Sequence, residues 1–382
     1  MNSLISRFFP FPRYLAMEAG GIEISDRSVK FMRLVRRRRK GVRVASFGEM
    51  LLPPGSIVGG EIRDMPLLIS ALTEMRRQAG FALCHASLPE SRGYLFTARV
   101  PRQFSADLRA GLALGLPAHV PLAPAETVFD GEIIPEESTS EEIGVAAVAF
   151  PEGLALAYAR AFEESGFLPL SFELEPQAAA RAMVQGSAAD SLSFRSAAGA
   201  PAGATIIIDF GEAKTILCVV ENGQARFTTS GEGSEGLDRA FAAQGWDARH
   251  IARHKIDVGL VGESAVQSEF SQAAEKLAAD IRRLATYWNA RGRADVSEGE
   301  PTLAHRARIE RAILYGGNAN IKGLAEYLSR AVGFTVEYAD IWRDMGIGGR
   351  VYPLPRNESV RFGTVAGLAM RGIARMAKEN GL

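Results

Sequence analysis

The chain of 382 residues is electrically balanced, because 44 Lys and Arg residues match 44 Asp and Glu residues. Its length predicts several subdomains, and its zero net charge argues against a general nucleic-acid-binding protein, which needs surplus cations for the phosphates. The two cysteines, Cys84 and Cys218, both lie in apolar runs, which predicts buried free thiols in a reducing compartment. No apolar run reaches the about 18–20 residues that span a bilayer, so we expect a cytoplasmic protein without a transmembrane segment of its own.

The first ordered part of the chain is predicted to begin with a β-hairpin, after a loose leader over residues 1–20. Its two strands are Gly21–Leu34 and Val42–Met50, and the turn between them contains four consecutive arginines that are expected to be solvated. Apolar residues at helical spacing then predict a helix over residues 60–80. Ala82–Leu88 is predicted to be the strand that closes this part.

The pattern changes over residues 89–168, where short strands and helices alternate around a proline-rich stretch. The predicted strands and helices are Gly93–Val100, Ser105–Leu116, Thr127–Pro135, Gly144–Pro151 and Leu154–Gly166. The edges of these strands are candidates for pairing with an extended peptide. Glu126, Asp130 and Glu132, expected on the neighbouring strand, would suit a peptide that carries a basic residue.

A strand, Leu168–Leu174, and a helix, Glu175–Gln185, are predicted next, followed by a connector rich in Ala, Ser and Gly over residues 186–204. Glu173 and Glu175 lie at the junction of this strand and helix. A carboxylate at the first turn of a helix interacts favourably with the helix N-terminus, and this explains Glu175 better than a catalytic role.

A second hairpin is predicted over Thr205–Ser230. Three isoleucines lead into Asp209-Phe210-Gly211, and Asn222-Gly223 marks a tight turn because both residues tolerate positive φ. An aspartate at the end of a buried strand, followed by a glycine, places a carboxylate and closely approaching backbone at the mouth of a sheet. The donors of the following residues, 212–215, could then bind a phosphate or its metal.

The two hairpins align with each other. When Glu23 is laid on Asp209, Ser25 falls on Gly211, and apolar residues then fall opposite each other at Phe31/Leu217, Met32/Cys218 and Leu34/Val220. Two copies of a strand, an acidic loop and a second strand indicate a duplicated α/β domain whose halves face one cleft.

The last part begins with helical segments over residues 236–294, in which His250 and His254 lack the neighbouring ligands of a metal site. The elements predicted after it are Ile309–Leu314, Ile321–Val332, Phe334–Tyr338 and Ser359–Lys378. The first of these ends in Gly316-Gly317-Asn318. Such a turn either brings backbone close to a ligand or makes a tight strand–helix connection, and the sequence leaves both open.

In their order and spacing, these motifs resemble the type IV pilus assembly protein PilM family, actin-like relatives of the cell-division protein FtsA. The stretches that carry the resemblance are Gly21–Leu34, Ala86–Pro101, Phe172–Met183, the Asp209 hairpin, Glu275–Trp288, Ile313–Asp340 and Phe362–Gly372. The resemblance implies an α/β, actin-like ATPase fold with duplicated ribonuclease-H-like domains and an inserted 1C-type subdomain. The implied parts are 21–88 with 169–204 and 350–382 (1A), 89–168 (1C-like), 205–240 with 300–349 (2A) and 241–299 (a helical insertion, 2B).

The resemblance also implies a site for ATP or ADP with Mg²⁺, in which Asp209 acts on the metal through the nucleotide. The residues at the matching positions are Ser25, Asp26, Arg27, Ser28, Lys30, Asp209, Gly211, Glu212, Ala213, Lys214, Thr215, Gly316, Gly317 and Asn318.

The sequence departs from the family at several of these positions. Glu23 replaces an aspartate, Ser25 replaces a glycine, and the adenosine turn has an asparagine as its third residue. Arg249 or His250 lies near the usual place of a ribose-binding carboxylate, and a cation cannot accept the ribose hydroxyl protons. We therefore expect weak nucleotide binding without rapid hydrolysis.

For partners, the resemblance implies a scaffold peripheral to the inner membrane that binds the N-terminal tail of a PilN-like inner-membrane protein. It also implies contacts with other pilus or secretion proteins, and a homo-oligomer is possible. Three alternatives share the fold: a sugar or small-molecule kinase, which needs a catalytic base, an FtsA-like filament-forming ATPase, and the cytoplasmic part of a type II secretion component of the GspL kind.

Overall fold

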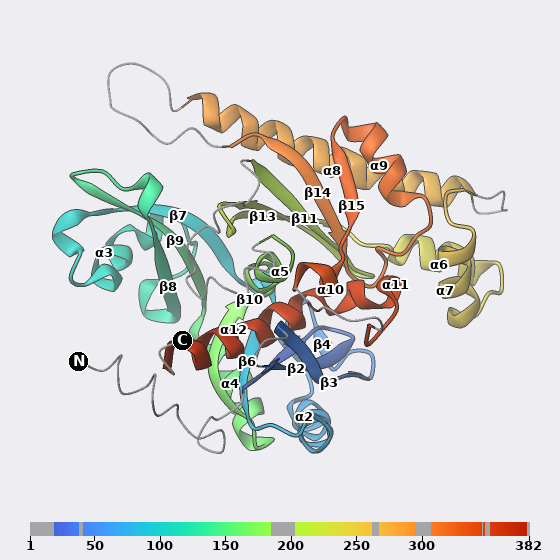
Figure 1. Ribbon diagram of the computed structural model, residues 1–382, viewed down its shortest axis with the longest axis horizontal. Coiled ribbons are helices and arrows are strands. Elements are labelled where there is room, and N and C mark those ends of the chain that lie inside the picture. The colour runs from blue at the N-terminus through green and yellow to red at the C-terminus, as the bar shows by residue number, and fades with distance from the viewer. Residues whose placement is uncertain are drawn as a thin grey trace. The chain divides into compact units, whose positions relative to one another are not determined.

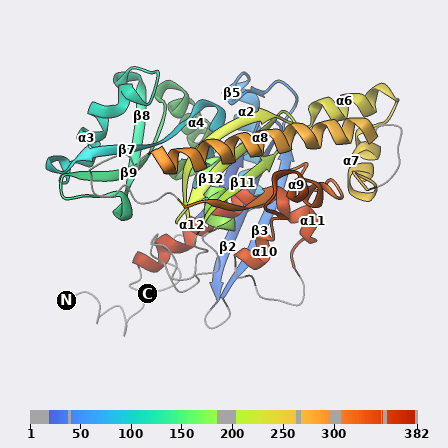
Figure 2. The same ribbon diagram turned by 90° about the horizontal axis from the view of Figure 1, so that it is seen from above.

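The computed structural model describes residues 19–37, 41–184, 203–261, 267–294, 307–345, 347 and 352–379. The predicted leader and connector therefore lie almost entirely outside the described residues, as does the tip of the first hairpin. The chain divides into two compact units, shown in Figures 1 and 2. Unit 1 is Met1–Gly199 with Trp342–Pro353 and Thr364–Leu382, and unit 2 is Ala200–Ile341 with Leu354–Gly363. The finer division into five parts stays a prediction.

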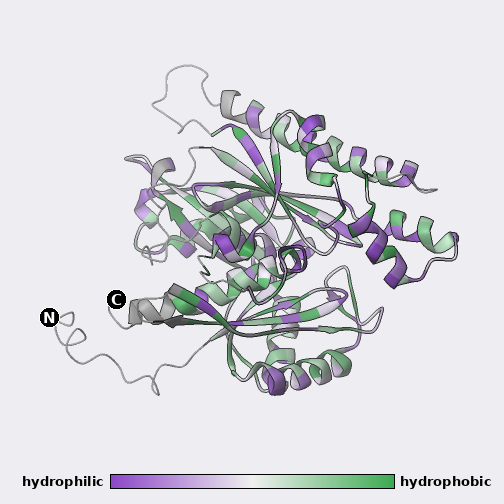
Figure 3. Ribbon diagram, turned by 45° about the vertical axis from the view of Figure 1, so that its right-hand side comes forward, coloured by the Kyte–Doolittle hydropathy of each residue, from purple (hydrophilic) through white to green (hydrophobic). Residues whose placement is uncertain are grey.

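Unit 1 contains a five-stranded sheet in the order β10-β6-β1-β2-β3. Its strands are β1 Gly20–Ile24, β2 Ser28–Arg37, β3 Gly41–Leu51, β6 Leu83–Leu88 and β10 Leu168–Leu174. The first three form an antiparallel meander, whereas β6 and β10 run parallel to β1. Strands β1 and β6 are buried along nearly their whole length, as expected for strands that are covered on both faces, and Figure 3 shows the hydropathy of each residue.

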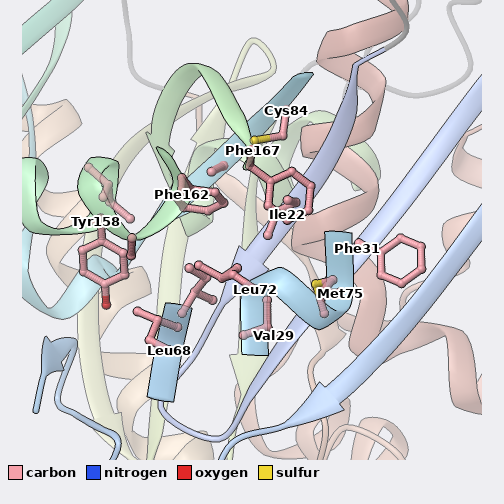
Figure 4. Packing of buried hydrophobic residues seen from close by; sticks show 14 of the residues in the cluster. Ile22, Val29, Phe31, Leu68, Leu72, Met75, Cys84, Tyr158, Phe162 and Phe167 are labelled. Atoms are coloured by element: carbon pink, nitrogen blue, oxygen red, sulfur yellow. The ribbon is translucent and has the colours of Figure 1, made fainter. Parts of the chain in front are cut away.

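One face of this sheet is packed against α2 (Met65–Ala79) and α4 (Glu152–Glu164), as Figure 4 shows. Helix α2 begins where the Asp64 side chain accepts a hydrogen bond from the Leu67 N–H, and it ends at Gly80 with φ 72°. Its buried residues Leu68, Leu72 and Met75 recur at helical spacing and meet Ile22 and Val29 of the sheet. Burial of each large side chain contributes about 1.5–3 kcal/mol.

The opposite face is covered by α5 (Glu175–Met183) and α12 (Gly363–Glu379). Glycines permit the close approach, because a Cβ on Gly21 would lie 2.6 Å from the Ala369 nitrogen. A Cβ on Gly367 would overlap the Ala178 carbonyl oxygen. The three layers position the ends of β1 and β10, where the candidate site residues of unit 1 lie.

Two short strands, β4 (Ile57–Val58) and β5 (Glu61–Ile62), form a small hairpin that the sequence analysis missed. Its turn consists of Gly59 and Gly60, both with positive φ. The helix predicted to start at residue 60 therefore starts at Met65, after the turn.

The inserted subdomain contains a three-stranded antiparallel sheet in the order β7-β9-β8, at the left of Figure 1. Its elements are β7 Tyr94–Pro101, α3 Leu108–Gly115, β8 Thr127–Ile134 and β9 Glu142–Pro151. Helix α3 packs on one face through Leu112, which joins a cluster with Val100 and Val145. Since β9 is central, β7 and β8 are the two edge strands.

Unit 2 repeats the sheet of unit 1. Its strands are β11 Ala204–Phe210, β12 Lys214–Glu221, β13 Gln224–Glu232, β14 Ile309–Tyr315 and β15 Thr335–Tyr338. The order β13-β12-β11-β14-β15 matches β3-β2-β1-β6-β10, and each corresponding pair has the same parallel or antiparallel sense. The predicted duplication is thus confirmed, with the two hairpins in separate sheets.

The helices of unit 2 follow the second hairpin and the strand β14. They are α6 Glu235–Ala243, α7 Ala248–Asp257, α8 Gln267–Ala294, α9 Leu324–Val332 and α11 Arg356–Ser359, with α10 Ile341–Asp344 at the boundary of the two units. The long α8 lies alongside α9 in Figures 1 and 2. Helix α9 starts later than predicted, because Gly323 precedes it with φ 80°.

Candidate functional site

The acidic loop of unit 2 lies between β11 and β12. Asp209 pairs with Ile216 one step before the end of the ladder and is half-buried. The loop closes with a hydrogen bond from the Gly211 N–H to the Lys214 carbonyl, 3.1 Å. The carbonyls of Gly211 and Glu212 accept from the N–H groups of Ser234 and Glu235, which fastens the loop to the start of α6.

The corresponding loop of unit 1 has the same register. Glu23 pairs with Lys30 one step before the end of the β1–β2 ladder, and the Ser25 N–H donates to the Ser28 carbonyl at 2.9 Å. These are the positions that the sequence alignment of the two hairpins predicts. Glu23 is therefore the structural counterpart of Asp209.

The polar side chains of the unit 1 loop are engaged within the protein. Glu23 forms a buried ion pair with Lys30 at 2.8 Å and accepts from the Val365 N–H near the start of α12. The Ser25 hydroxyl oxygen accepts from the Ser28 N–H at 3.1 Å. The Ser28 hydroxyl donates to Glu49 at 2.9 Å. A phosphate at this loop would have to displace several of these bonds.

Asp26 and Arg27 occupy the tip of the same loop. The Asp26 carboxylate accepts from the N–H groups of Gly59 and Gly60, at 2.7 and 3.0 Å, while Arg27 is exposed. The five predicted residues of unit 1 thus lie in this loop and at the start of β2, and the side chains of Ser25, Asp26, Ser28 and Lys30 all form hydrogen bonds within unit 1.

A pocket of about 280 Å³ lies in unit 2. It is lined by Glu212, Asp238, Ala248, Ile251, Ala252, Lys255, Ile256, Gly317, Asn318, Asn320 and Ile321. The acidic loop, α6, α7 and the turn after β14 all contribute. Three of the predicted residues, Glu212, Gly317 and Asn318, therefore line one cavity.

The pocket wall carries a buried polar cluster that the sequence analysis missed. The Lys255 ammonium is ion-paired with Asp238, donates to the Asn318 side-chain oxygen at 2.7 Å and lies 3.4 Å from the Ser234 hydroxyl. The Ser234 hydroxyl in turn donates to Asp238 at 3.0 Å. Lys255 is 7% exposed, so the charge is held by these partners rather than by water.

The cation of α7 that lines this pocket is Lys255. Arg249 and His250 do not line the pocket, and His250 instead stacks on Trp246 with ring centres 4.5 Å apart. The residues of α7 that line it are spaced at one helical face, from Ala248 to Lys255. The carboxylates that line the pocket come from the acidic loop, as Glu212, and from α6, as Asp238.

The turn after β14 uses its two glycines differently. Gly316 has φ 101°, and a Cβ there would lie 2.2 Å from a carboxylate oxygen of Asp209. Gly317 is exposed, and a Cβ there would meet nothing within 4 Å. The Asn318 N–H donates to the Phe210 carbonyl at 3.0 Å, which ties the turn to the end of β11.

The other predicted residues of unit 2 lie around the loop. Thr215 is fully buried, and its hydroxyl donates to the Glu232 carbonyl at 2.7 Å. Ala213 is exposed, and Lys214 is half-buried at the start of β12. Thr215 thus stabilises the β12–β13 pair and offers no hydroxyl to a ligand in this structure.

Glu173 and Glu175 are both used within unit 1. Both carboxylate oxygens of Glu173 accept hydrogen bonds from the Arg181 guanidinium, at 2.8 and 2.6 Å, and one of them also accepts from Arg371 at 3.1 Å. Burial alone would raise the pKa of Glu173, but the two guanidinium groups hold it below its usual range. Glu175 begins α5, as predicted, and accepts from the Glu90 N–H at 3.2 Å. Neither carboxylate is placed as a general base for a bound substrate.

The three residues of the inserted subdomain that are predicted to bind a partner, Glu126, Asp130 and Glu132, are exposed. Asp130 and Glu132 lie on one face of the edge strand β8, opposite Val148 and Ala146 of β9. Glu126 is not on the strand, because Pro124 starts a 3₁₀ turn that ends at Glu126, and β8 begins one residue later.

Two kinds of feature are absent from the described residues. They contain no group of three or more His, Cys, Asp or Glu residues arranged to hold a metal ion. No helix among them is both long and apolar enough to cross a membrane.

No protein-family model matches the sequence, and a search of the curated proteins found no match either. Among solved structures, a chain of the PilM–PilN type IV pilus biogenesis complex is similar, with a TM-score of 0.73 and 17% identity. The similarity covers 94% of this chain and 99% of that one.

Two other similar structures have lower TM-scores. The ethanolamine utilization protein EutJ from Carboxydothermus hydrogenoformans has a TM-score of 0.48 at 15% identity, covering 97% of this chain and 95% of that one. MreB5 of Spiroplasma citri bound to ADP has a TM-score of 0.49 at 10% identity, covering 94% and 98%. The duplicated sheets and the similarity to the PilM–PilN structure establish that this chain has the actin-like fold.

Proposed function

We propose that this protein is an actin-like scaffold of a type IV pilus or a related machine, which binds the N-terminal tail of a PilN-like inner-membrane protein. The observation that supports this most is the similarity over nearly the full length of both chains to a protein of the PilM–PilN complex. In this proposal the protein lies in the cytoplasm, peripheral to the inner membrane through its partners. Contacts with other pilus or secretion proteins and with copies of itself belong to the same proposal.

The inserted subdomain offers suitable chemistry for such a tail. Strands β7 and β8 are edges that can pair with an extended peptide. Asp130 and Glu132 give the β8 edge a negative charge that would attract a basic residue of the tail.

A nucleotide site is a second part of the proposal. The unit 2 pocket suits a nucleoside, since Ile251 and Ile256 provide apolar walls and Asp238 and Asn318 provide polar groups. Asp209 and the loop 211–214 would then lie on the phosphate side, with Mg²⁺ held through the nucleotide. The polar side chains of the unit 1 loop are hydrogen-bonded within the protein, and Lys255 is ion-paired with Asp238. For both reasons we expect weak binding of ATP or ADP.

A kinase is the alternative that this geometry supports less well. A kinase needs a carboxylate free to accept the proton of a substrate hydroxyl. Glu173 is fixed between two arginines, and Glu175 accepts a backbone N–H.

The test measures binding of a fluorescent synthetic peptide with the sequence of a PilN-like N-terminal tail from the same organism. We expect a Kd of about 1 μM, equivalent to about −8 kcal/mol. The double substitution Glu126→Lys with Glu132→Lys should weaken this binding at least tenfold, because it reverses the charge beside the β8 edge.

The control is Glu163→Lys with Glu164→Lys on α4, which changes the net charge equally at another surface of unit 1. It should leave the affinity unchanged. If the β8 variant, folded by circular dichroism, binds as tightly as the wild type, the tail does not dock beside β8. If the unmodified protein does not bind the peptide at all, the proposed function is wrong.

A further inference from the structure

The β4–β5 turn connects parts of unit 1 that are far apart in the sequence. Three other segments form hydrogen bonds with Gly59 and Gly60 of this turn. They are the β1–β2 loop, the 3₁₀ segment Glu90–Arg92 and helix α4. The two glycines have φ values of 56° and 79°, and the strands on either side pair Val58 with Glu61. Two consecutive residues with positive φ make a type I′ turn.

Asp26 holds this turn from the side of the β1–β2 loop. One carboxylate oxygen accepts from the Gly59 N–H at 2.7 Å and the other from the Gly60 N–H at 3.0 Å. Bonds from N–H groups to an ionised carboxylate are stronger than neutral ones. The family resemblance implies a nucleotide site at Asp26, whereas its carboxylate accepts hydrogen bonds from the two glycine amides.

The carbonyls of the same two glycines hold the inserted subdomain. The Gly59 carbonyl accepts from the Arg92 guanidinium at 2.8 Å and from the Ser91 hydroxyl at 3.3 Å. The Gly60 carbonyl accepts from the buried Tyr158 hydroxyl at 3.0 Å.

These partners are the two connections of the inserted subdomain to unit 1. Ser91 and Arg92 lie just before β7, where the chain enters the subdomain, and Tyr158 lies on α4, which follows β9 as the chain returns. Arg92 is also ion-paired with Glu61 of β5 at 3.1 Å. The turn therefore binds Asp26 through its N–H groups and both connections through its C=O groups.

We propose that Asp26 is a positioning residue, a latch that fixes the inserted subdomain through the Gly59–Gly60 turn. Any ligand that draws the Asp26 carboxylate away from the turn loosens both connections together. A change at the β1–β2 loop is thereby transmitted to the subdomain with the β8 edge. The latch itself requires no ligand, and only its effect on tail binding rests on the proposed function.

Hydrogen–deuterium exchange of the full-length protein tests the latch. In Asp26→Ala, exchange should be about tenfold or more faster in residues 57–62, because two charge-assisted bonds are lost. Exchange should also be faster in residues 89–94 and 152–160. Asp26→Asn keeps one acceptor and should give an intermediate effect.

The matched control is Asp107→Ala, which removes a carboxylate that accepts the Ala110 N–H at the start of α3. It should raise exchange in α3 and leave residues 57–62 unchanged. If it loosens residues 57–62 as much as Asp26→Ala does, the effect is global destabilisation and the latch is refuted. The latch is equally refuted if Asp26→Ala loosens the turn while residues 89–94 and 152–160 exchange as in the wild type.

Tyr158→Phe tests whether the turn couples Asp26, which binds its N–H groups, to Tyr158, which binds its Gly60 carbonyl. This variant removes only the hydroxyl that binds the Gly60 carbonyl, so the unfolding free energies of Asp26→Ala and Tyr158→Phe should not add in the double variant. Additive effects would mean that the turn does not couple them. A weaker tail affinity in Asp26→Ala would link the latch to the proposed function. An unchanged affinity alongside faster exchange in all three segments would reject that link and leave the latch intact.

Discussion

Gly316 and Gly317 are adjacent and identical, yet their surroundings assign them different roles. Gly316 lies against Asp209 and has a φ of 101°, which residues other than glycine rarely adopt. Gly317 borders the unit 2 pocket with open space where a Cβ would be. The two interpretations of this turn are thus divided between its residues, since the first glycine is needed for the connection and the second can face a ligand.

Gly316→Ala should therefore lower the free energy of unfolding by at least about 2 kcal/mol, since it combines an unfavourable φ with a clash at Asp209. Gly317→Ala is the matched control and should change it by less than about 0.5 kcal/mol. Chemical denaturation of both variants measures the difference. Equal stabilities of the two variants would show that the turn relaxes without cost.

One face of helix α7 lines the unit 2 pocket, and another packs against aromatic rings. Ala248, Ile251, Ala252 and Lys255 face the pocket, whereas its two histidines face away from it. His254 contacts Trp246 with ring centres 4.8 Å apart and Phe270 at 6.0 Å. These rings fasten α7 to the preceding loop and to α8, and hence position the pocket wall.

The His254 contacts predict a dependence of stability on pH. Burial lowers the pKa of His254, the nearby His250 lowers it further, and Asp257 opposes them. The folded state then binds the proton less readily than the unfolded state, whose histidine titrates near the usual value of about 6.5. Stability is therefore unaffected above that pH and falls as the pH drops below it towards the folded pKa.

Thermal unfolding at pH 7.5 and pH 5.5 measures this effect, in a range above the titration of most carboxylates. His254→Phe keeps a ring in the cluster and removes the titrating group, so it should reduce the difference between the two midpoints. Phe227→Leu, which changes an aromatic residue of unit 2 that packs against Tyr287, serves as the control and should retain the wild-type difference. If His254→Phe retains it as well, another group is responsible.

At the scale of the whole molecule, two sheets of identical order carry different additions. Unit 1 inserts a three-stranded subdomain between β6 and β10, and unit 2 inserts α6, α7 and α8 between β13 and β14. The counterpart loops have diverged as well, because Glu23 is ion-paired and Asp209 adjoins the Gly316 turn. Any nucleotide should accordingly depend mainly on unit 2.

We expect MgADP to raise the thermal midpoint of the full-length protein. At an ADP concentration of 100 times its Kd, binding should add about 2.7 kcal/mol to the free energy of unfolding. Asp209→Ala should abolish this shift. The control Asp257→Ala, on an exposed residue of α7 outside the pocket, should retain it. A shift that survives Asp209→Ala, or ATP turnover of about 1–10 s⁻¹ as in working enzymes, would contradict a weak-binding site at this loop.

The sequence by itself determined the duplication, since hydrophobic alternation predicts the matching β1–β2 and β11–β12 pairs and the Asn222-Gly223 turn joins β12 to β13. It also located the inserted subdomain and the loops at the ends of β1 and β11. These features depend on residues close together along the chain, where spacing alone sets the geometry.

Tertiary structure alone decided which of the polar side chains near those loops are already bonded to other parts of the protein. Nothing in the local sequence shows that Asp26 binds the amides of Gly59 and Gly60, or that Lys255 meets Asp238 and Asn318. Each contact joins segments about 17 to 63 positions apart, and a charged side chain at the end of a strand can equally bind a ligand or a distant backbone group. The sequence predicts helical segments over residues 236–294, but which face of α7 meets the pocket depends on how α6 and α8 pack against it.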